Sequence, residues 1–299
     1  MDPSPTPRHA AGSHGHVVAI LGRGLVPADE PVITADDLGF TRGDGCFDSM
    51  RVLINLVGAG APIDLDAHLD RMAGSAAALA ITPPTHEQWR ELVELALSAW
   101  PHPGEATVRL VLTRGREWQP GIPTALVTVS AISRAAIGTG PAGAISAITL
   151  SRGHPSDAFR DAPWLLGGVK TLSYVVNVAA KRVAAERGAD DVIFTTTDGY
   201  ALDGPTSGLL VARGGRLLST PTGDTGILAS TSVTRIVATA AAAGWPTGYE
   251  LIPVAELFDA QGVWLVSSSR GPAPVTRLDG RDLAVDPDLV ARVAQLAGF

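Results

Sequence analysis

Cysteine and long apolar runs are scarce in this chain of 299 residues. Cys46 is the only cysteine, so no disulfide can form within the chain, and a reducing, cytoplasmic location is expected. No apolar run approaches the roughly 18 residues that a membrane span requires. The Pro-, Ser-, Gly- and His-rich residues 1–15 lack the apolar stretch of a signal peptide and are expected to be a disordered leader. The net charge of −7 argues against nucleic acid or an anionic membrane as a partner.

Lysine is scarcer still, because all basic residues except Lys170 and Lys181 are arginines. A coding bias explains arginine wherever a positive charge suffices, but arginine cannot replace an amine that must lose its proton. Lys170 precedes an apolar pattern that predicts a helix over 171–188, and a helix start and partial burial both lower the pKa of an amine. A neutral amine can form a Schiff base with a carbonyl, whereas the alternative is a solvated lysine in a first helical turn. Lys181, in mid-helix, is expected on an exposed face.

Hydrophobic periodicity predicts two mixed α/β units, and hence an α+β fold with two domains rather than a doubly wound parallel sheet. The linker between them is expected at 134–143, which is small, Gly-containing and without periodicity. In the first domain, 16–133, strands are predicted over 16–26, 106–115 and 124–132, a hairpin over 46–64, and helices over 64–80 and 84–100. In the second domain, 144–299, strands are predicted over 144–150 and 262–269, hairpins over 191–204 and 208–220, and helices over 171–188, 230–244 and 286–298.

Two predicted helices carry residues suited to bind an anion. Arg71 shares a helix face with His68, and its guanidinium fork suits a phosphate, although the same face would also serve as a solvated stripe. Thr231 and Ser232 stand at a predicted helix start, where free N–H groups bind phosphate, and ordinary N-capping is the alternative. The sequence contains no phosphate-binding P-loop, no metal-ligand helix motif and no cysteine cluster, so no metal is expected.

Taken in order, these segments resemble the class IV aminotransferases, the fold type IV enzymes that use pyridoxal 5′-phosphate (PLP). The resemblance runs from about residue 17 to 285, nearly the whole chain. The segments on which the resemblance rests are RGDGCFDSMRV, AHLDRMAGSAAAL, VKTLSYVVNVAAKR, GADDVIFTTTDGYALDGPTSGLLV, ILASTSVTR and VWLVSSSRGPAPVTRLDG. It implies PLP as the cofactor, a small-molecule amine as the substrate, and a homodimer with the site between the two domains.

The resemblance also implies roles for residues around the cofactor. Lys170 matches the lysine that forms the Schiff base with the cofactor aldehyde. Arg71 matches the arginine on the cofactor phosphate. Thr231 and Ser232 match residues whose backbone amides surround that phosphate.

Two further positions match cofactor contacts, and one departs from the family pattern. Ser268 matches a threonine that also reaches the phosphate, and Tyr174 lies where residues contact the ring. Asp203 stands in place of a glutamate that pairs with the pyridine nitrogen. A carboxylate there keeps the nitrogen protonated, so that the ring accepts electrons, but aspartate is one methylene shorter.

The substrate side departs from the pattern as well. D-amino-acid aminotransferases place an arginine and a histidine beyond the T-R-G turn, where this chain has TRGREWQPG at 113–121. The usual carboxylate anchor is therefore missing, and Arg109, Arg114 or Arg116 would have to replace it. Phe47 lies in GDGCF, the segment that most resembles the 4-amino-4-deoxychorismate lyases.

The resemblance thus implies a lyase that releases pyruvate and 4-aminobenzoate from aminodeoxychorismate, a step of folate biosynthesis. The first alternative is an aminotransferase acting on D-amino or branched-chain amino acids, including a bifunctional enzyme. The second alternative is a PLP-binding protein with little catalysis, because both the glutamate and the carboxylate anchor are replaced.

Overall fold

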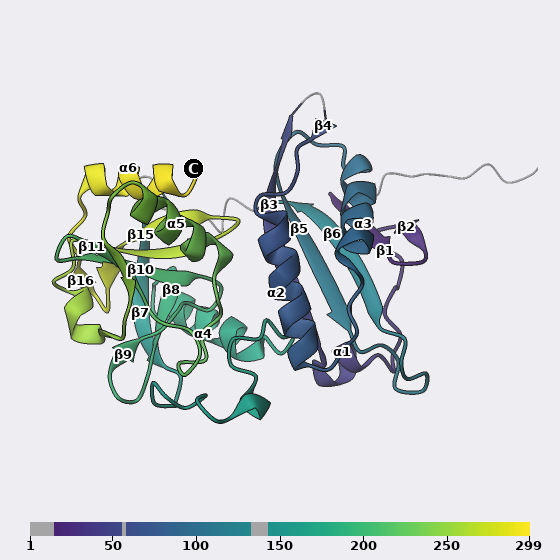
Figure 1. Ribbon diagram of the computed structural model, residues 1–299, viewed down its shortest axis with the longest axis horizontal. Coiled ribbons are helices and arrows are strands. Elements are labelled where there is room, and N and C mark those ends of the chain that lie inside the picture. Colours follow the sequence, from purple (N-terminus) through teal and green to yellow (C-terminus); the bar gives the residue numbers. More distant parts are fainter. Residues whose placement is uncertain (1–14, 56–57, 133–142) are drawn as a thin grey trace, which may run out of the picture.

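The computed structural model describes residues 15–55, 58–132 and 143–299, and their strands form two separate sheets (Figure 1). The predicted leader and linker lie outside these residues, apart from one terminal residue of each. One sheet precedes the gap at 133–142 and the other follows it, whereas the exact domain limits stay a prediction. The combination of mixed sheets and packed helices confirms the expected α+β class.

The first sheet is antiparallel throughout, in the order β2-β1-β6-β5-β3-β4. Its core side packs against two helices (Figure 1), and its buried residues include Met50, Leu69 and Trp89. The strands are β1 (His16–Ile20), β2 (Gly24–Val26), β3 (Gly45–Asn55), β4 (Gly58–Ala59), β5 (Gly104–Thr113) and β6 (Thr124–Ala131). The helices are α1 (Leu38–Arg42), α2 (Leu65–Ala78) and α3 (His86–Ser98).

Successive side chains of the two strands β3 and β5 point alternately to the two faces of this sheet. Even-numbered residues of β3 and β5, such as Met50 and Val108, are buried in the core. Odd-numbered residues point to the opposite face, where Phe47, Ser49, Arg109 and Val111 line a pocket. The period of two therefore assigns side chains either to packing or to the pocket.

The second sheet is mixed, in the order β12-β11-β10-β14-β15-β7-β8-β9-β13, with β16 paired to β15. Helices α5 and α6 share one apolar cluster with it, and α4 packs on β8. The strands are β7 (Ile145–Ser151), β8 (Asp191–Thr195), β9 (Tyr200–Ala201), β10 (Gly208–Arg213), β11 (Arg216–Ser219), β12 (Thr247–Tyr249), β13 (Ile252–Pro253), β14 (Gly262–Ser267), β15 (Gly271–Leu278) and β16 (Arg281–Asp282). The helices are α4 (Val175–Glu186), α5 (Thr231–Ala242) and α6 (Pro287–Leu296), with 3₁₀ turns at Pro163–Leu165 and Val254–Leu257.

The predicted start of the helix over 171–188 is wrong. Helix α4 begins at Val175, and Tyr174 is its N-cap residue. Thr171 instead forms an isolated β-bridge with Cys46 of β3. The apolar period of this segment continues N-terminally of the helix, but the bridge at Thr171 and the bond from the Leu172 N–H to the Gly45 carbonyl tie the preceding residues to the first sheet.

Strand β15 was not predicted, because it contains Pro272 and Pro274 and proline argues against an inner strand. It nevertheless pairs with β14 on one side and with β7 on the other. Pairing with β7 begins only at Val275, beyond both prolines, so their missing N–H groups leave that ladder intact. Over the described residues, no helix is both long and apolar enough to cross a membrane.

Candidate active site

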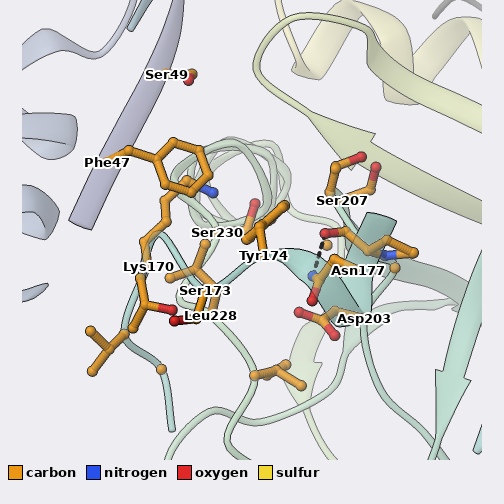
Figure 2. Close-up of a pocket in the computed structure, with 18 of the residues that line it drawn as sticks. Phe47, Ser49, Lys170, Ser173, Tyr174, Asn177, Asp203, Ser207, Leu228 and Ser230 are labelled. Carbon is orange, nitrogen blue, oxygen red and sulfur yellow. Dashed lines mark hydrogen bonds between the residues drawn. The ribbon is translucent and has the colours of Figure 1, made fainter. Parts of the chain in front are cut away.

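A pocket of about 1090 Å³ lies between the two halves of the chain, and its lining comes from both of them (Figure 2). The first half of the chain supplies Phe47, Arg71 and Arg109, and the second half supplies Lys170, Asp203 and Thr231. Figure 2 shows Lys170 extending toward Phe47, with Asp203 on the other side of Tyr174.

The backbone of Lys170 is held by the first sheet although the residue belongs to the second half of the chain. Its N–H donates to Ser75 Oγ at 3.2 Å, and its carbonyl accepts from the Phe47 N–H at 3.0 Å. The Leu172 N–H donates to the Gly45 carbonyl at 2.9 Å. These bonds fix the Cα of Lys170 without a helix.

The amine of Lys170 lies among aromatic rings in a partly buried position. Nζ is 4.6 Å from the ring centroid of Phe47 and 5.6 Å from that of Tyr174. Burial lowers the pKa of Lys170 to about 8, and the positive charge of Arg71 acts in the same direction. The predicted direction and the predicted contribution of burial are therefore correct. The predicted contribution of a helix start is wrong, because α4 begins five residues later and Lys170 is outside its first turn.

Asp203 supplies a carboxyl group to the pocket, whose lining also includes Asp44, the partner of Arg114. Asp203 follows β9, and its backbone carbonyl accepts from the Phe194 N–H at 2.9 Å. Burial raises the pKa of Asp203 to about 6, while the positive charges of Arg152 and Lys170 oppose that rise. The carboxyl therefore changes its charge near pH 6 and is ionised above it.

The start of helix α5 and Arg71 together form an anion-binding cradle. Ser230 is the N-cap residue and accepts from the Val233 N–H, which leaves the N–H groups of Thr231 and Ser232 without intrahelical acceptors. Arg71 Nη1 donates to the Ala229 carbonyl at 2.9 Å, so the guanidinium lies next to the helix start. The alternative of a solvated stripe on α2 is wrong, because only 13% of the Arg71 side chain is exposed.

The remaining residues singled out in the sequence also line the pocket. Ser268 lines it and donates to the Ser49 carbonyl at 3.0 Å. Tyr174 packs edge-on against Phe47, and burial raises the pKa of Tyr174 to about 12, so its phenol stays neutral. Lys181 also lines the pocket, but its side chain is 40% exposed, as predicted, and its Nζ lies 3.7 Å from Asp191.

Of the three arginines considered for the substrate carboxylate, only Arg109 lines the pocket. Its Nε donates to Ser49 Oγ at 3.3 Å, and the side chain remains exposed on the pocket face of β5. Arg114 is engaged elsewhere, with Asp44 and with the carbonyls that end α2. Arg116 pairs with Asp36.

Asp48 is a site residue that sequence reasoning missed. Its carboxylate is fully buried and accepts from the Arg71 Nε and Nη2 at 2.8 and 2.7 Å. The sequence did contain a signal for Asp48. In the predicted strand CFDSMRV it lies on the same face as the apolar residues Cys46 and Met50, where a charged residue is unusual.

One pocket thus joins an amine of lowered pKa, a carboxyl, and a guanidinium beside a helix N-terminus. This donor set fits an aldehyde whose ring carries a basic nitrogen and a phosphate, which are the groups of PLP. Over the described residues there is no cluster of three or more His, Cys, Asp or Glu that would hold a metal ion.

Comparison with known proteins agrees with this chemistry. The family model for amino-transferase class IV matches residues 45–278. The chain belongs to the class IV aminotransferase family. This membership confirms the family resemblance and the PLP dependence expected from the sequence, whereas the roles of individual residues stay predictions.

Three relatives place this class IV aminotransferase more closely. A bifunctional aminodeoxychorismate lyase / D-amino acid transaminase from Mycobacterium tuberculosis is 42% identical over 279 residues, which cover 91% of this chain and 94% of that protein. The PLP-bound structure of a hypothetical aminotransferase from the same organism is 38% identical, with a TM-score of 0.86 and coverage of 95% and 97%. A fold IV transaminase from Curtobacterium pusillum is also 38% identical, with a TM-score of 0.84 and the same coverage.

Proposed function

We propose that this class IV aminotransferase homologue is a PLP-dependent 4-amino-4-deoxychorismate lyase that also transaminates D-amino acids at the same site. The observation that carries the proposal is the 42% identity, over 91% of the chain, to a protein with both activities. The pocket supports it, because Lys170 and Asp203 face a cavity that takes contributions from both sheets. A branched-chain aminotransferase remains the alternative that the family allows.

Each part of the cofactor has a residue to hold it. Arg71, Ser268 and the N–H groups of Thr231 and Ser232 would bind the phosphate. Asp203 would pair with the ring nitrogen and, ionised above about pH 6, would keep that nitrogen protonated.

The cofactor supplies, when bound, an aldehyde that takes up amines and a ring that accepts electrons. Lys170 Nζ is the base that this chain provides. With a pKa of about 8, it is close enough to neutral pH both to take a proton from the carbon that bears the substrate nitrogen and to return one. The neutral phenol of Tyr174 beside it adds no competing charge.

The two activities differ in where Lys170 returns its proton. In transamination Lys170 would return the proton on the cofactor side of the nitrogen, after which water would release a keto acid and the amino group would remain for transfer to a second keto acid. In the lyase reaction the proton goes to the departing enol-pyruvyl carbon, and pyruvate and 4-aminobenzoate leave. Aromatisation of the substrate ring drives the lyase reaction forward. The amine of Lys170 would transfer the proton in both reactions.

Arg109 is the residue that we assign to the substrate carboxylate. It projects from the pocket face of β5, and its Cζ lies 5.8 Å from the ring centroid of Phe47, which itself contacts the Lys170 amine. A guanidinium there meets a carboxylate on the substrate while Phe47 packs against its apolar part.

We further propose that the protein is a cytoplasmic homodimer, as the family resemblance implies. The buried free thiol of Cys46 suits a reducing compartment. Light scattering on the purified protein should give twice the chain mass of 30.8 kDa, and a monomer mass would contradict the assembly alone.

Two assays on purified protein loaded with PLP test the proposed activities. Aminodeoxychorismate should yield 4-aminobenzoate, and D-alanine with 2-oxoglutarate should yield pyruvate. Both should fall by about 10²- to 10⁴-fold in Lys170→Ala, because the variant lacks the proton-transferring base. Turnover of L-valine in place of both reactions would favour the branched-chain alternative, and PLP binding without any turnover would favour a passive binder.

A further inference from the structure

A single buried carboxylate organises one side of the phosphate cradle. Asp48 on β3 is fully buried and accepts from the Arg71 Nε and Nη2 at 2.8 and 2.7 Å. It also contacts His68 Nδ1 at 2.8 Å. This carboxylate therefore orients both the guanidinium and an imidazole.

The imidazole extends the contact across to the other side of the cradle. His68 is only 1% exposed, and its Nε2 lies 3.3 Å from Thr231 Oγ1 at the start of α5. Because an ionised carboxylate only accepts, Nδ1 of His68 carries a proton, and in the singly protonated imidazole Nε2 is left as an acceptor. The Thr231 hydroxyl then donates to Nε2, and this bond fixes the orientation of the Thr231 side chain.

Asp48 stays ionised throughout the working range of the protein. Burial acts to raise the pKa of its carboxyl, but the hydrogen bonds from Arg71 and His68 outweigh burial and hold the pKa well below its ordinary value. The contacts on both sides of Asp48 are therefore charge-assisted, which makes them strong and directional.

The contacts of Asp48 and His68 join residues that lie far apart in the sequence. Arg71 and His68 come from α2, whereas Thr231 begins α5 beside the second sheet. Without Asp48, the long side chain of Arg71 would keep its bond to the Ala229 carbonyl and a 3.3 Å contact of Nη2 with His68 Nδ1, and it would lose both bonds to the carboxylate. Restricting that side chain before the anion arrives removes an entropic cost of binding.

We propose that Asp48 and His68 are positioning residues of the phosphate cradle, and that they make this site selective for the phosphorylated form of its cofactor. The proposal rests on the PLP dependence described above and extends it to residues that do not reach the anion themselves. It predicts that breaking the contacts of Asp48 and His68 weakens binding of the phosphate. Formation of the Schiff base between Lys170 and the aldehyde should remain intact.

Two aldehydes separate these effects, because PLP and pyridoxal differ only in the phosphate. Dissociation constants of apo-protein for both are measured by the absorbance of the Schiff base. We expect Asp48→Asn to raise the Kd for PLP by about 10- to 100-fold, since it removes the charge that orients Arg71. The Kd for pyridoxal should stay within about threefold, which is the size of context effects in such measurements.

Asp37→Asn is the matched control for burying an amide in place of a carboxylate. Asp37 is also buried in the first sheet's half and accepts from Thr113, Thr124 and the Gly39 N–H, but it lies outside the pocket lining. Its substitution should cost folding stability and leave the affinities for both aldehydes unchanged.

Two milder variants decide the case even where Asp48→Asn does not fold. His68→Asn keeps a donor for Asp48 but no longer reaches Thr231, and Thr231→Val removes the hydroxyl while keeping the backbone N–H. Each should raise the Kd for PLP several-fold, and the double variant should lose no more than the worse single variant, because both break one contact.

The outcomes distinguish this inference from the proposed function. Wild-type protein that binds neither aldehyde would contradict the PLP dependence itself. Wild-type protein that binds PLP, with single variants that are unchanged or that weaken PLP and pyridoxal alike, would overturn only the positioning role. Additive losses in the double variant would do so too, since they would mean that Thr231 meets the phosphate independently of His68.

Discussion

At Lys170 the burial that makes the amine reactive also destabilises the fold. The unfolded amine keeps its proton up to a pKa of 10.5, whereas in the folded protein the pKa is about 8. Folding therefore opposes protonation, and the cost is present in full below pH 8 and disappears as the pH rises toward 10.5. The site is a local compromise between stability and reactivity.

Lys170→Met should consequently stabilise the apo-protein while abolishing turnover. We expect its free energy of unfolding at pH 7 to rise by up to about 3 kcal/mol, the equivalent of the pKa difference. The gain should shrink toward zero as the pH approaches 10.5. Urea unfolding at several pH values measures it, and Lys181→Met, which changes the other, exposed lysine, should show no such pH-dependent gain. A pH-independent effect in both variants would contradict the argument.

Asp203 tests whether the shorter carboxylate replaces the family glutamate. Asp203→Asn removes the charge that would keep the ring nitrogen protonated, so kcat should fall by about 10²-fold or more. Asp203→Glu restores the family residue type and should retain most of the activity. Steady-state kinetics of 4-aminobenzoate release measure kcat for both variants. Equal losses of kcat would contradict the prediction, because they would show that the length of the side chain matters as much as its charge.

At the scale of elements, the loops before Lys170 and before α5 are fastened to each other. The Gly168 N–H donates to the Gly226 carbonyl at 2.9 Å, and the ring of Phe159 packs between Gly167 and Gly226. A Cβ at Gly226 would lie 2.3 Å from that ring, so only glycine fits. The catalytic amine and the phosphate cradle thus share one loop packing.

Gly226→Ala should damage both stability and activity, and Gly223→Ala provides its matched control. Both glycines have positive φ angles, of 70° and 80°, so both variants pay about 1 kcal/mol or more for backbone strain. Only at Gly226 does the new methyl group also displace Phe159, because Gly223 faces open space. We expect Gly226→Ala to lose more stability in urea unfolding than Gly223→Ala, and we expect only Gly226→Ala to lower kcat/KM. Equal effects of the two substitutions would exclude the packing explanation.

At the scale of the whole molecule, the pocket is where the two halves of the chain are connected. Direct bonds cross between the halves from Lys170 to Ser75, from Ser268 to Ser49, and from Arg71 to Ala229. A cofactor held from both sides adds to these bonds and links the stability of one half to that of the other.

PLP should therefore raise the unfolding temperature of the entire chain in one transition. At a free concentration of 100 times its Kd, it should add about 2.7 kcal/mol to the free energy of unfolding. Differential scanning calorimetry measures the shift, and inorganic phosphate at the same concentration is the control that lacks the aldehyde. Two transitions, of which PLP moves only one, would contradict the coupling.

Local sequence patterns were sufficient for most elements of this fold. The capping box of α3 illustrates why, because Thr85 and Gln88 bond each other's backbone N–H within four residues. The start of α4 and strand β15 could not be predicted in the same way. The pairing of Thr171 with Cys46, and of β15 with β7, is made by residues more than a hundred positions away.

The sequence by itself determined the secondary-structure periods, the scarcity of lysine that marked Lys170, and the family pattern of the site residues, because these depend on residue type and spacing. Only the tertiary structure decided which groups surround the Lys170 amine, which of the three candidate arginines lines the pocket, and that Asp48 organises Arg71 and His68. Burial and charge proximity act through space, and here they arise between segments whose contact no local pattern records.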